Sequence, residues 1–170
     1  MSAAQIAAMS TVQIAAITGD QMSNLTTAQI KGWTAAQKKA YTSPLALDLD
    51  GNGINTLSAQ SGVNFDVNND GVKERTGWIA RNDGLLVRDL NDDALINNGG
   101  ELFGEGTLLA NGRRASDGYQ ALSIMDSNHD GLVNKLDKDF GSLKVWQDAN
   151  GNGISDKGEL KSLTELGIAE

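Results

Sequence analysis

The chain has 170 residues, of which 22 are acidic and 14 basic, so its formal net charge is -8. This length suffices for one compact domain and a small additional unit. An acidic chain without clustered Lys and Arg does not suit nucleic acid as a partner, and it favours cations. The absence of cysteine excludes disulfides and thiolate metal sites. No segment reaches the roughly 18 apolar residues of a membrane span, and we expect a monomer without a cleavable N-terminal signal.

Residues 1–43 are rich in Ala, Gln and Thr and form an eight-residue repeat. In each copy a Ser or Thr precedes a Gln by three positions, which is the spacing of a reciprocal capping box at a helix start. The five pairs are Ser2/Gln5, Ser10/Gln13, Thr18/Gln21, Thr26/Gln29 and Thr34/Gln37. Because eight residues do not match the 3.6-residue helical period, one straight helix would spread its apolar residues around its axis. Two interpretations stay open, a small solenoid of short helical turns and a helical linker.

Pro44, the only proline, separates this segment from a second unit at residues 44–170, where Gly, Asn, Asp and β-forming residues dominate. Alternating apolar residues such as Val63 and Phe65 predict short strands in its first part. From residue 118 onward apolar residues recur at helical spacing, which predicts an EF-hand-like helix-loop-helix pair over 118–168. The predicted fold class is α+β, with the helical repeat first, short strands and acidic loops next, and the helix pair at the C-terminal end.

Five segments of the second unit place Asp or Asn at alternating positions, and four of the five have glycine at position 6. Calcium takes six to eight oxygen ligands, and carboxylates at positions 1, 3 and 5 can converge on it where glycine allows a sharp turn. The sequence therefore predicts Ca²⁺ as the cofactor. The loops, numbered first to fifth, begin at Asp48, Asp66, Asp89, Asp126 and Asp148.

The fourth and fifth loops follow the EF-hand pattern as far as an acidic residue at position 12. Position 8 holds the usual apolar residue, Val133, in the fourth loop but Ser155 in the fifth. The two loops are predicted to form a pair of calcium sites. The predicted ligands are Asp126, Asn128, Asp130, Asn134 and Asp137 in the fourth loop, and Asp148, Asn150, Asn152, Asp156 and Glu159 in the fifth.

The other three loops depart from this pattern. The third has Ala94 at position 6, and its acidic residue Glu101 falls at position 13 rather than 12. The first and second loops lack an acidic residue at position 12, and turns rich in Asn, Asp and Gly also occur between strands without an ion. For these two loops a metal site and a plain turn both stay open. The candidate ligands are Asp89, Asn91, Asp93 and Glu101 in the third loop, Asp48, Asp50 and Asn52 in the first, and Asp66, Asn68 and Asp70 in the second.

Longer motifs extend over residues 44–168. They are Pro44-Leu-Ala-Leu-Asp-Leu-Asp50, Thr76-Gly-Trp78, Asp83-Gly-Leu-Leu-Val-Arg-Asp-Leu-Asn91, Glu101-Leu-Phe-Gly104, Val145-Trp-Gln-Asp148 and Glu159-Leu. On these motifs the chain resembles the calcium-dependent self-processing module of FrpC-like RTX proteins, the large bacterial toxins and adhesins exported by type I secretion. The N-terminal Ala-Gln-Ile octads are similar to repeats in such proteins. The resemblance implies an extracellular location.

In that family, calcium folds the module and triggers cleavage of an Asp-Pro bond at its N-terminal edge. The resemblance implies that the aspartate carboxylate attacks its own carbonyl and the prolyl nitrogen leaves. The resulting cyclic anhydride is then hydrolysed or captured by a lysine amine of an acceptor protein. Here Pro44 matches the proline, but Ser43 stands in place of the aspartate. Because a hydroxyl cannot form the anhydride, we expect Ser43 to block cleavage.

The sequence thus predicts a secreted RTX-type module that folds on binding calcium. It is related to a self-cleaving module, but with Ser43 in place of the aspartate it is expected not to cleave itself. Two alternatives stay open. In the first, calcium triggers cleavage at or beside Ser43-Pro44, with a lysine-bearing protein as the acceptor. In the second, the chain is a dockerin-like adaptor in which the loop pair at 126 and 148 presents helices to a partner protein.

Overall fold

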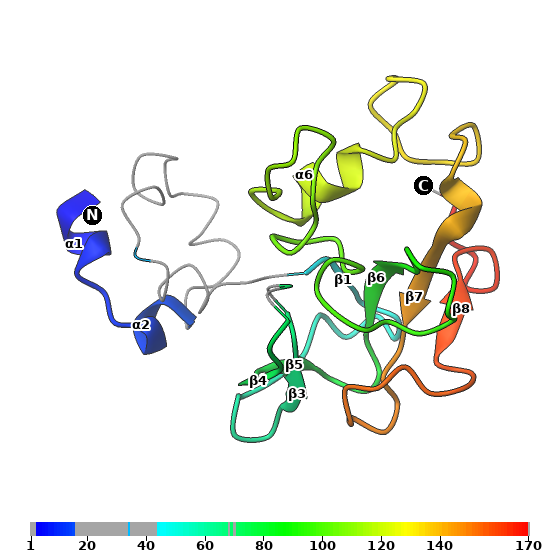
Figure 1. The fold of residues 1–170 in the computed structure, drawn as a ribbon. Coiled ribbons are helices and arrows are strands. Elements are labelled where there is room, and N and C mark those ends of the chain that lie inside the picture. Colours follow the sequence, from blue (N-terminus) through cyan, green and yellow to red (C-terminus); the bar gives the residue numbers. More distant parts are fainter. Residues whose placement is uncertain (1–2, 16–33, 35–43, 68, 70, 170) are drawn as a thin grey trace. The chain divides into compact units, whose positions relative to one another are not determined.

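A computed structural model describes residues 3–15, 34, 44–67, 69 and 71–169 (Figure 1). The chain divides into two compact units, Met1–Thr42 and Ser43–Glu170. In the described residues the first unit contains short helices, and the second contains short strands with few short helices. Within the described ranges, no helix combines the length and apolarity needed to cross a bilayer.

The described part of the N-terminal unit contains two short helices separated by a capped restart. Ser10 and Gln13 form the predicted reciprocal capping box: the Gln13 N–H donates to the Ser10 hydroxyl at 3.2 Å, and the Ser10 N–H donates to Oε1 of Gln13 at 2.9 Å. Ile6 and Ile14, one octad apart, are both fully buried. Each of the other predicted capping pairs includes a residue outside the described part. The helices are α1 (Ala3–Ala7) and α2 (Thr11–Ala15).

The second unit is organised around a four-stranded antiparallel sheet in the order β1-β6-β7-β8. Leu85 lies opposite Trp146 and Leu86 opposite Val145 across β6 and β7. Because successive side chains of a strand point to opposite faces, this register supplies apolar side chains to both faces of the sheet. The strands are β1 (Ala46–Leu47), β6 (Gly84–Arg88), β7 (Leu143–Trp146) and β8 (Leu160–Ser162).

One face of this sheet packs against two small antiparallel pairs, β2 with β5 and β3 with β4. Phe65, Trp78 and Trp146 form an aromatic cluster between them, with ring centroids 5.1, 5.7 and 5.4 Å apart. Rings at these separations and tilted to one another pack favourably beyond the area that they bury. The strands are β2 (Thr56–Leu57), β3 (Val63–Phe65), β4 (Glu74–Thr76) and β5 (Trp78–Ile79).

The opposite face of the sheet packs against α6 (Gly118–Ser123) and η1 (Phe140–Ser142). Asp117 begins α6, because its side chain accepts a hydrogen bond from the Gln120 N–H at 2.8 Å. The buried Ala121 of α6 joins Leu86 and Val145 of the sheet in one apolar cluster. Figure 1 shows the sheet between α6 and the β3–β5 strands.

The predicted C-terminal helix pair is wrong. In the described residues, the fourth loop lies between α6 and η1, and the fifth loop connects β7 to β8. Leu136, which has helical spacing to Phe140 and Leu143, is 76% exposed, whereas Val145 and Trp146 are fully buried in β7. Pairing with β6 buries both faces of residues 143–146, and this tertiary gain overrides the helical spacing. The unit is therefore mostly antiparallel strands with few short helices, and the dockerin-like alternative loses the helices that it required.

Candidate metal centres

All five acidic loops adopt the same turn. In each, the N–H of the residue at position 6 donates to Oδ2 of the aspartate at position 1, at 2.8 or 2.9 Å. The pairs are Gly53/Asp48, Gly71/Asp66, Ala94/Asp89, Gly131/Asp126 and Gly153/Asp148. The first three loops, whose sequences depart from the EF-hand pattern, thus share the turn of the two that follow it.

The backbone of each loop is left-handed at positions 4 and 6, with φ between 53° and 91°. Glycine adopts this conformation without cost, which explains its place at position 6 in four loops. Ala94 of the third loop is the exception at position 6, with φ of 63°. A side chain at such a φ strains the backbone. The residues at position 4 are Gly51, Asn69, Asp92, His129 and Gly151.

In the fourth loop the acidic residue at position 12 closes the turn. Asp137 is 5% exposed and accepts hydrogen bonds from the Ser127 N–H at 2.7 Å and the Asn134 N–H at 2.9 Å. The Asn134 bond, followed by those from Ser127 and Asn128, lowers the pKa of Asp137 below its ordinary value. Asn128 donates its side-chain amide to Asp130 at 3.0 Å, so the predicted ligands lie side by side.

In the fifth loop the carboxylates at positions 1 and 12 are bonded to the aromatic core. Asp148 is 1% exposed and accepts from the Trp78 indole N–H at 2.7 Å. Glu159 is 8% exposed and accepts from the Trp146 indole at 3.3 Å. It also accepts from the N–H groups at positions 2 and 9, at 3.0 and 3.1 Å, just as Asp137 does in the fourth loop.

Three further predicted ligands of the fifth loop lie together on its exposed side. Asn152 and Asn150 donate their side-chain amides to Asp156, at 2.9 and 2.8 Å. These two hydrogen bonds lower the pKa of Asp156. The oxygens predicted to bind an ion in this loop are therefore held near one another by the chain itself.

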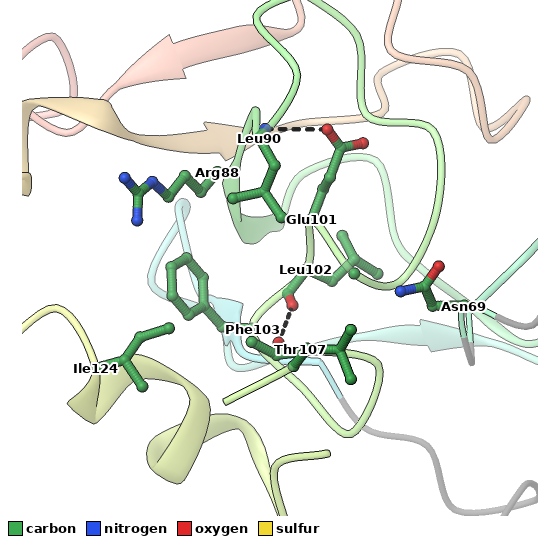
Figure 2. Close-up of a pocket in the computed structure, with 10 residues that line it drawn as sticks. Asn69, Arg88, Leu90, Glu101, Leu102, Phe103, Thr107 and Ile124 are labelled. Carbon is green, nitrogen blue, oxygen red and sulfur yellow. Dashed lines mark hydrogen bonds between the residues drawn. The ribbon is translucent and has the colours of Figure 1, made fainter. Parts of the chain in front are cut away.

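In the third loop the displaced Glu101 makes the contacts of a position-12 acid. It accepts from the Leu90 N–H at 3.1 Å and the Asn97 N–H at 2.7 Å, which are again positions 2 and 9. Figure 2 shows Glu101 reaching Leu90 beside a small pocket. Asn91 and Asp93 are joined by a side-chain hydrogen bond of 3.1 Å. The extra residue thus changes the spacing of the third loop without changing its closure.

The fifth loop is bonded to the third, rather than to the fourth as predicted. Ile96 and Ser155 occupy position 8 of these two loops and are both 3% exposed. The Ile96 N–H donates to the Ser155 hydroxyl at 2.7 Å. Within the described residues no hydrogen bond joins the fourth loop to the fifth. Serine at this position, which broke the predicted pattern, is the residue that links the two loops.

Three predicted site residues fall outside the described part. They are Asn68 and Asp70 of the second loop, and Ser43. Asp66, which begins the second loop, is 5% exposed, and its carbonyl accepts from the Gly99 N–H at 2.6 Å. Pro44 is half-buried, and the residue after it, Leu45, donates its N–H to the Phe103 carbonyl at 2.8 Å.

The first loop gains a third carboxylate from elsewhere in the fold. Carboxylate oxygens of Asp48, Asp50 and Asp83 all lie within 4.8 Å of one another. Asn52 donates its side-chain amide to Asp50 at 2.7 Å. Sequence reasoning missed Asp83 as a candidate ligand because no loop spacing indicates it: Asp83 lies 28 residues beyond Asn55, from whose N–H it accepts a hydrogen bond.

Two buried oxygens test whether these loops suit a cation. Oδ1 of Asp83 and Oδ1 of Asp89 are buried and accept no hydrogen bond. Burying a carboxylate oxygen without a partner is costly, and a bound cation would remove that cost. The ligands available are carboxylate, amide and backbone oxygens, the set that calcium prefers. The residues present therefore fit calcium.

Comparison with known proteins identifies the family of the chain. A family model described as the SPM domain matches residues 45–170, and one described as the ALTTAQ repeat matches residues 1–27. The chain belongs to the SPM domain family. This chain is 54% identical over 127 residues to the iron-regulated protein FrpA of Neisseria meningitidis serogroup C. The match covers 74% of this chain and 11% of FrpA, and it identifies the domain as a self-processing module of FrpC-like RTX proteins.

Proposed function

We propose that this SPM domain is a calcium-binding module that folds around its ions, and that Ser43 leaves it unable to cleave itself. The observation that carries the proposal is the turn common to the five loops, in which a position-6 N–H holds the position-1 carboxylate. In the third, fourth and fifth loops a second carboxylate closes the turn. Oxygen atoms converging in this way bind calcium in EF-hand loops.

The charge of the chain explains why the ions would also control folding. The formal net charge is -8, and the loops bring several acidic groups close together. Without a cation, these carboxylates repel one another and loosen the folded state. Because the complete sites exist only in the folded chain, the free energy of calcium binding adds to the free energy of unfolding.

The block to cleavage follows from the chemistry of one side chain. Attack by an aspartate carboxylate on its own carbonyl forms a cyclic anhydride and releases the prolyl nitrogen, as the family resemblance implies. The Ser43 hydroxyl cannot form an anhydride. The proline side of the bond is in place, because Leu45 is bonded to Phe103 and its carbonyl accepts from the Leu86 N–H at 2.9 Å. Replacement of a single side chain thus accounts for a module that folds without cleaving.

The relative FrpA supports an extracellular location for the domain. This chain covers 11% of FrpA, which supports a role for the domain as one part of a large secreted RTX-type protein. Millimolar extracellular calcium suits loops of the weaker EF-hand class. Calcium would then fold the domain only after export, where the ion becomes plentiful.

One experiment tests both parts of the proposal. Calcium is titrated into the wild-type chain and into Ser43→Asp, circular dichroism follows folding, and intact mass follows cleavage. We expect calcium to order both chains and chelator to unfold them, with one mass for wild type and two fragments joining at 43/44 for Ser43→Asp. Unchanged dichroism and melting temperature would refute calcium-dependent folding. Cleavage of the wild-type chain would instead favour the active alternative.

A further inference from the structure

Asp83 is a buried acid with one unused oxygen. It lies in the tight turn that precedes β6, where its N–H donates to the Ala80 carbonyl at 3.1 Å. Its side chain is fully buried. Oδ2 accepts from the Asn55 N–H at 2.8 Å, whereas Oδ1 accepts no hydrogen bond. Burying a carboxylate oxygen without a partner is costly, and a cation beside it would remove that cost.

The groups beside Asp83 are themselves acidic. Asp48 and Asp50 place carboxylate oxygens within 4.8 Å of it and of each other. No basic side chain in the described part of the chain forms an ion pair with any of the three. Three carboxylates so close together repel one another unless a cation lies between them.

We propose that Asp83 completes a calcium site with Asp48 and Asp50 of the first loop. Asp83 replaces the position-12 acid that the loop lacks, and it approaches from the turn before β6. The inference rests on the proposed function in taking calcium as the ion. Calcium suits the site better than magnesium, because flexible loop oxygens and water satisfy its variable coordination while magnesium demands a near-ideal octahedron.

The position of the site gives the ion a structural role. Asp48 follows β1 directly, and Asp83 directly precedes β6, the strand that pairs with β1. The paired residues are Ala46 with Leu85 and Leu47 with Gly84. β1 has only two residues paired with β6 and lies at the edge of the sheet, where the backbone bonds of Leu45 to Phe103 and Leu86 also hold it. An ion bound to Asp48 and Asp83 ties the edge strand to β6 and thereby orders the segment that follows Pro44.

The site also differs in when it forms. The fourth and fifth loops carry all their predicted ligands within one loop, whereas the first loop is complete only after β1 has paired with β6. Calcium therefore binds the first loop after the sheet has formed and stabilises that pairing. Calcium binding at the first loop thus depends on the pairing of β1 with β6, whereas binding at the fourth and fifth loops depends only on the conformation of each loop.

The test counts calcium ions. Native mass spectrometry of the full chain at millimolar free calcium compares wild type with Asp83→Asn, Asp50→Asn and Asp92→Asn. Asp92 is exposed and is not a predicted ligand, so its variant matches the loss of charge without touching the site. Asp50 is exposed, so its variant keeps the fold even where Asp83→Asn fails to fold. Hydrogen exchange over residues 44–50 and 83–86, with and without calcium, measures whether the ion protects the pairing of β1 with β6.

We expect Asp83→Asn and Asp50→Asn to bind one ion fewer than wild type, and Asp92→Asn to bind the same number. Calcium-dependent protection of residues 44–50 should be lost in the first two variants alone. An unchanged count and unchanged protection in Asp50→Asn would overturn the site while leaving calcium binding elsewhere intact. A wild-type chain that binds no calcium would overturn both this site and the proposed function.

Discussion

The fifth and first loops have almost the same sequence, Asp-Ala-Asn-Gly-Asn-Gly and Asp-Leu-Asp-Gly-Asn-Gly, but differ in their surroundings. In the fifth loop Asp148 and Glu159 are buried and accept hydrogen bonds from the indoles of Trp78 and Trp146. In the first loop the position-1 aspartate is exposed, and the buried acid comes from a distant turn. The same motif is thus built into the core in one place and lies on the surface in the other.

This difference separates two properties of the acidic loops, the shape of the turn and its rigidity. The turn is local, because a position-1 carboxylate bonded to a position-6 N–H occurs in both loops at 2.8 Å. Its rigidity depends on neighbours, because ligands held by packed groups in a dry environment lose little freedom on binding. We infer that the fifth loop is pre-arranged by the core and that the first depends more on the ion itself.

The largest expected effect comes from removing the position-1 acid of each loop. Asp148→Ala leaves the Trp78 indole and the N–H groups of Gly151, Asn152 and Gly153 without their acceptor. Urea unfolding at saturating calcium should show a loss of about 3 kcal/mol or more. Asp48→Ala removes an exposed acid, so its loss should be clearly smaller. Equal losses would contradict the distinction between a core-bonded and a surface loop.

A smaller effect should come from exchanging the residue at position 6. Ala94→Gly relieves the positive φ of the third loop and should raise the free energy of unfolding by roughly 0.5–1 kcal/mol. Gly131→Ala in the fourth loop is the matched reverse change, because no atom outside its neighbours lies within 4 Å of the added Cβ and only its φ of 86° opposes it. It should lower the free energy by about 1 kcal/mol. A lower free energy of unfolding for Ala94→Gly would show that the positive φ of Ala94 does not strain the third loop.

The smallest effect should appear in the pH dependence. Hydrogen bonds, first from the Gly53 N–H, lower the pKa of Asp48 below its ordinary value of 3.8, and the amides of Asn152 and Asn150 do the same for Asp156. A lowered pKa in the folded chain gives stability that is present above the unfolded value of 3.8 and is lost as the pH falls through the lower, folded value. The melting temperature should therefore fall in this acid range. NMR titration of the carboxyl carbons checks both groups, and values at or above 3.8 would contradict the loop geometry.

Much of the site could be predicted from the sequence because its determinants are local. Alternating acids followed by glycine imply the left-handed turn at position 6, and the fourth and fifth loops close with Asp137 and Glu159 at the predicted spacing. The Ser10/Gln13 capping box is local in the same way. Glu101 could be proposed as the acid of the third loop, although its position alone did not show that it reaches the same two N–H groups.

The C-terminal helices could not be judged from spacing alone. Leu136, Phe140 and Leu143 recur at helical spacing, but Leu143 begins the strand that pairs with β6, and only that partner decides between helix and strand. Pairing buries Val145 and Trp146 completely, which a surface helix would not do. The helical prediction failed because it treated a segment whose partner lies far away in the chain as if it were isolated.

By itself, the sequence determined the turns of the acidic loops, their candidate oxygen ligands, the presence of Ser43 where the family resemblance implies an aspartate, and membership of the SPM domain family. Only the tertiary structure decided which groups meet. It joined the third loop to the fifth through Ser155, placed the indoles on the buried acids, and brought Asp83 to the first loop. The physical reason is the sequence separation of the contacts. A turn depends on the few neighbouring residues that form it, whereas the approach of two carboxylates far apart in the chain depends on the pairing of the strands beside them.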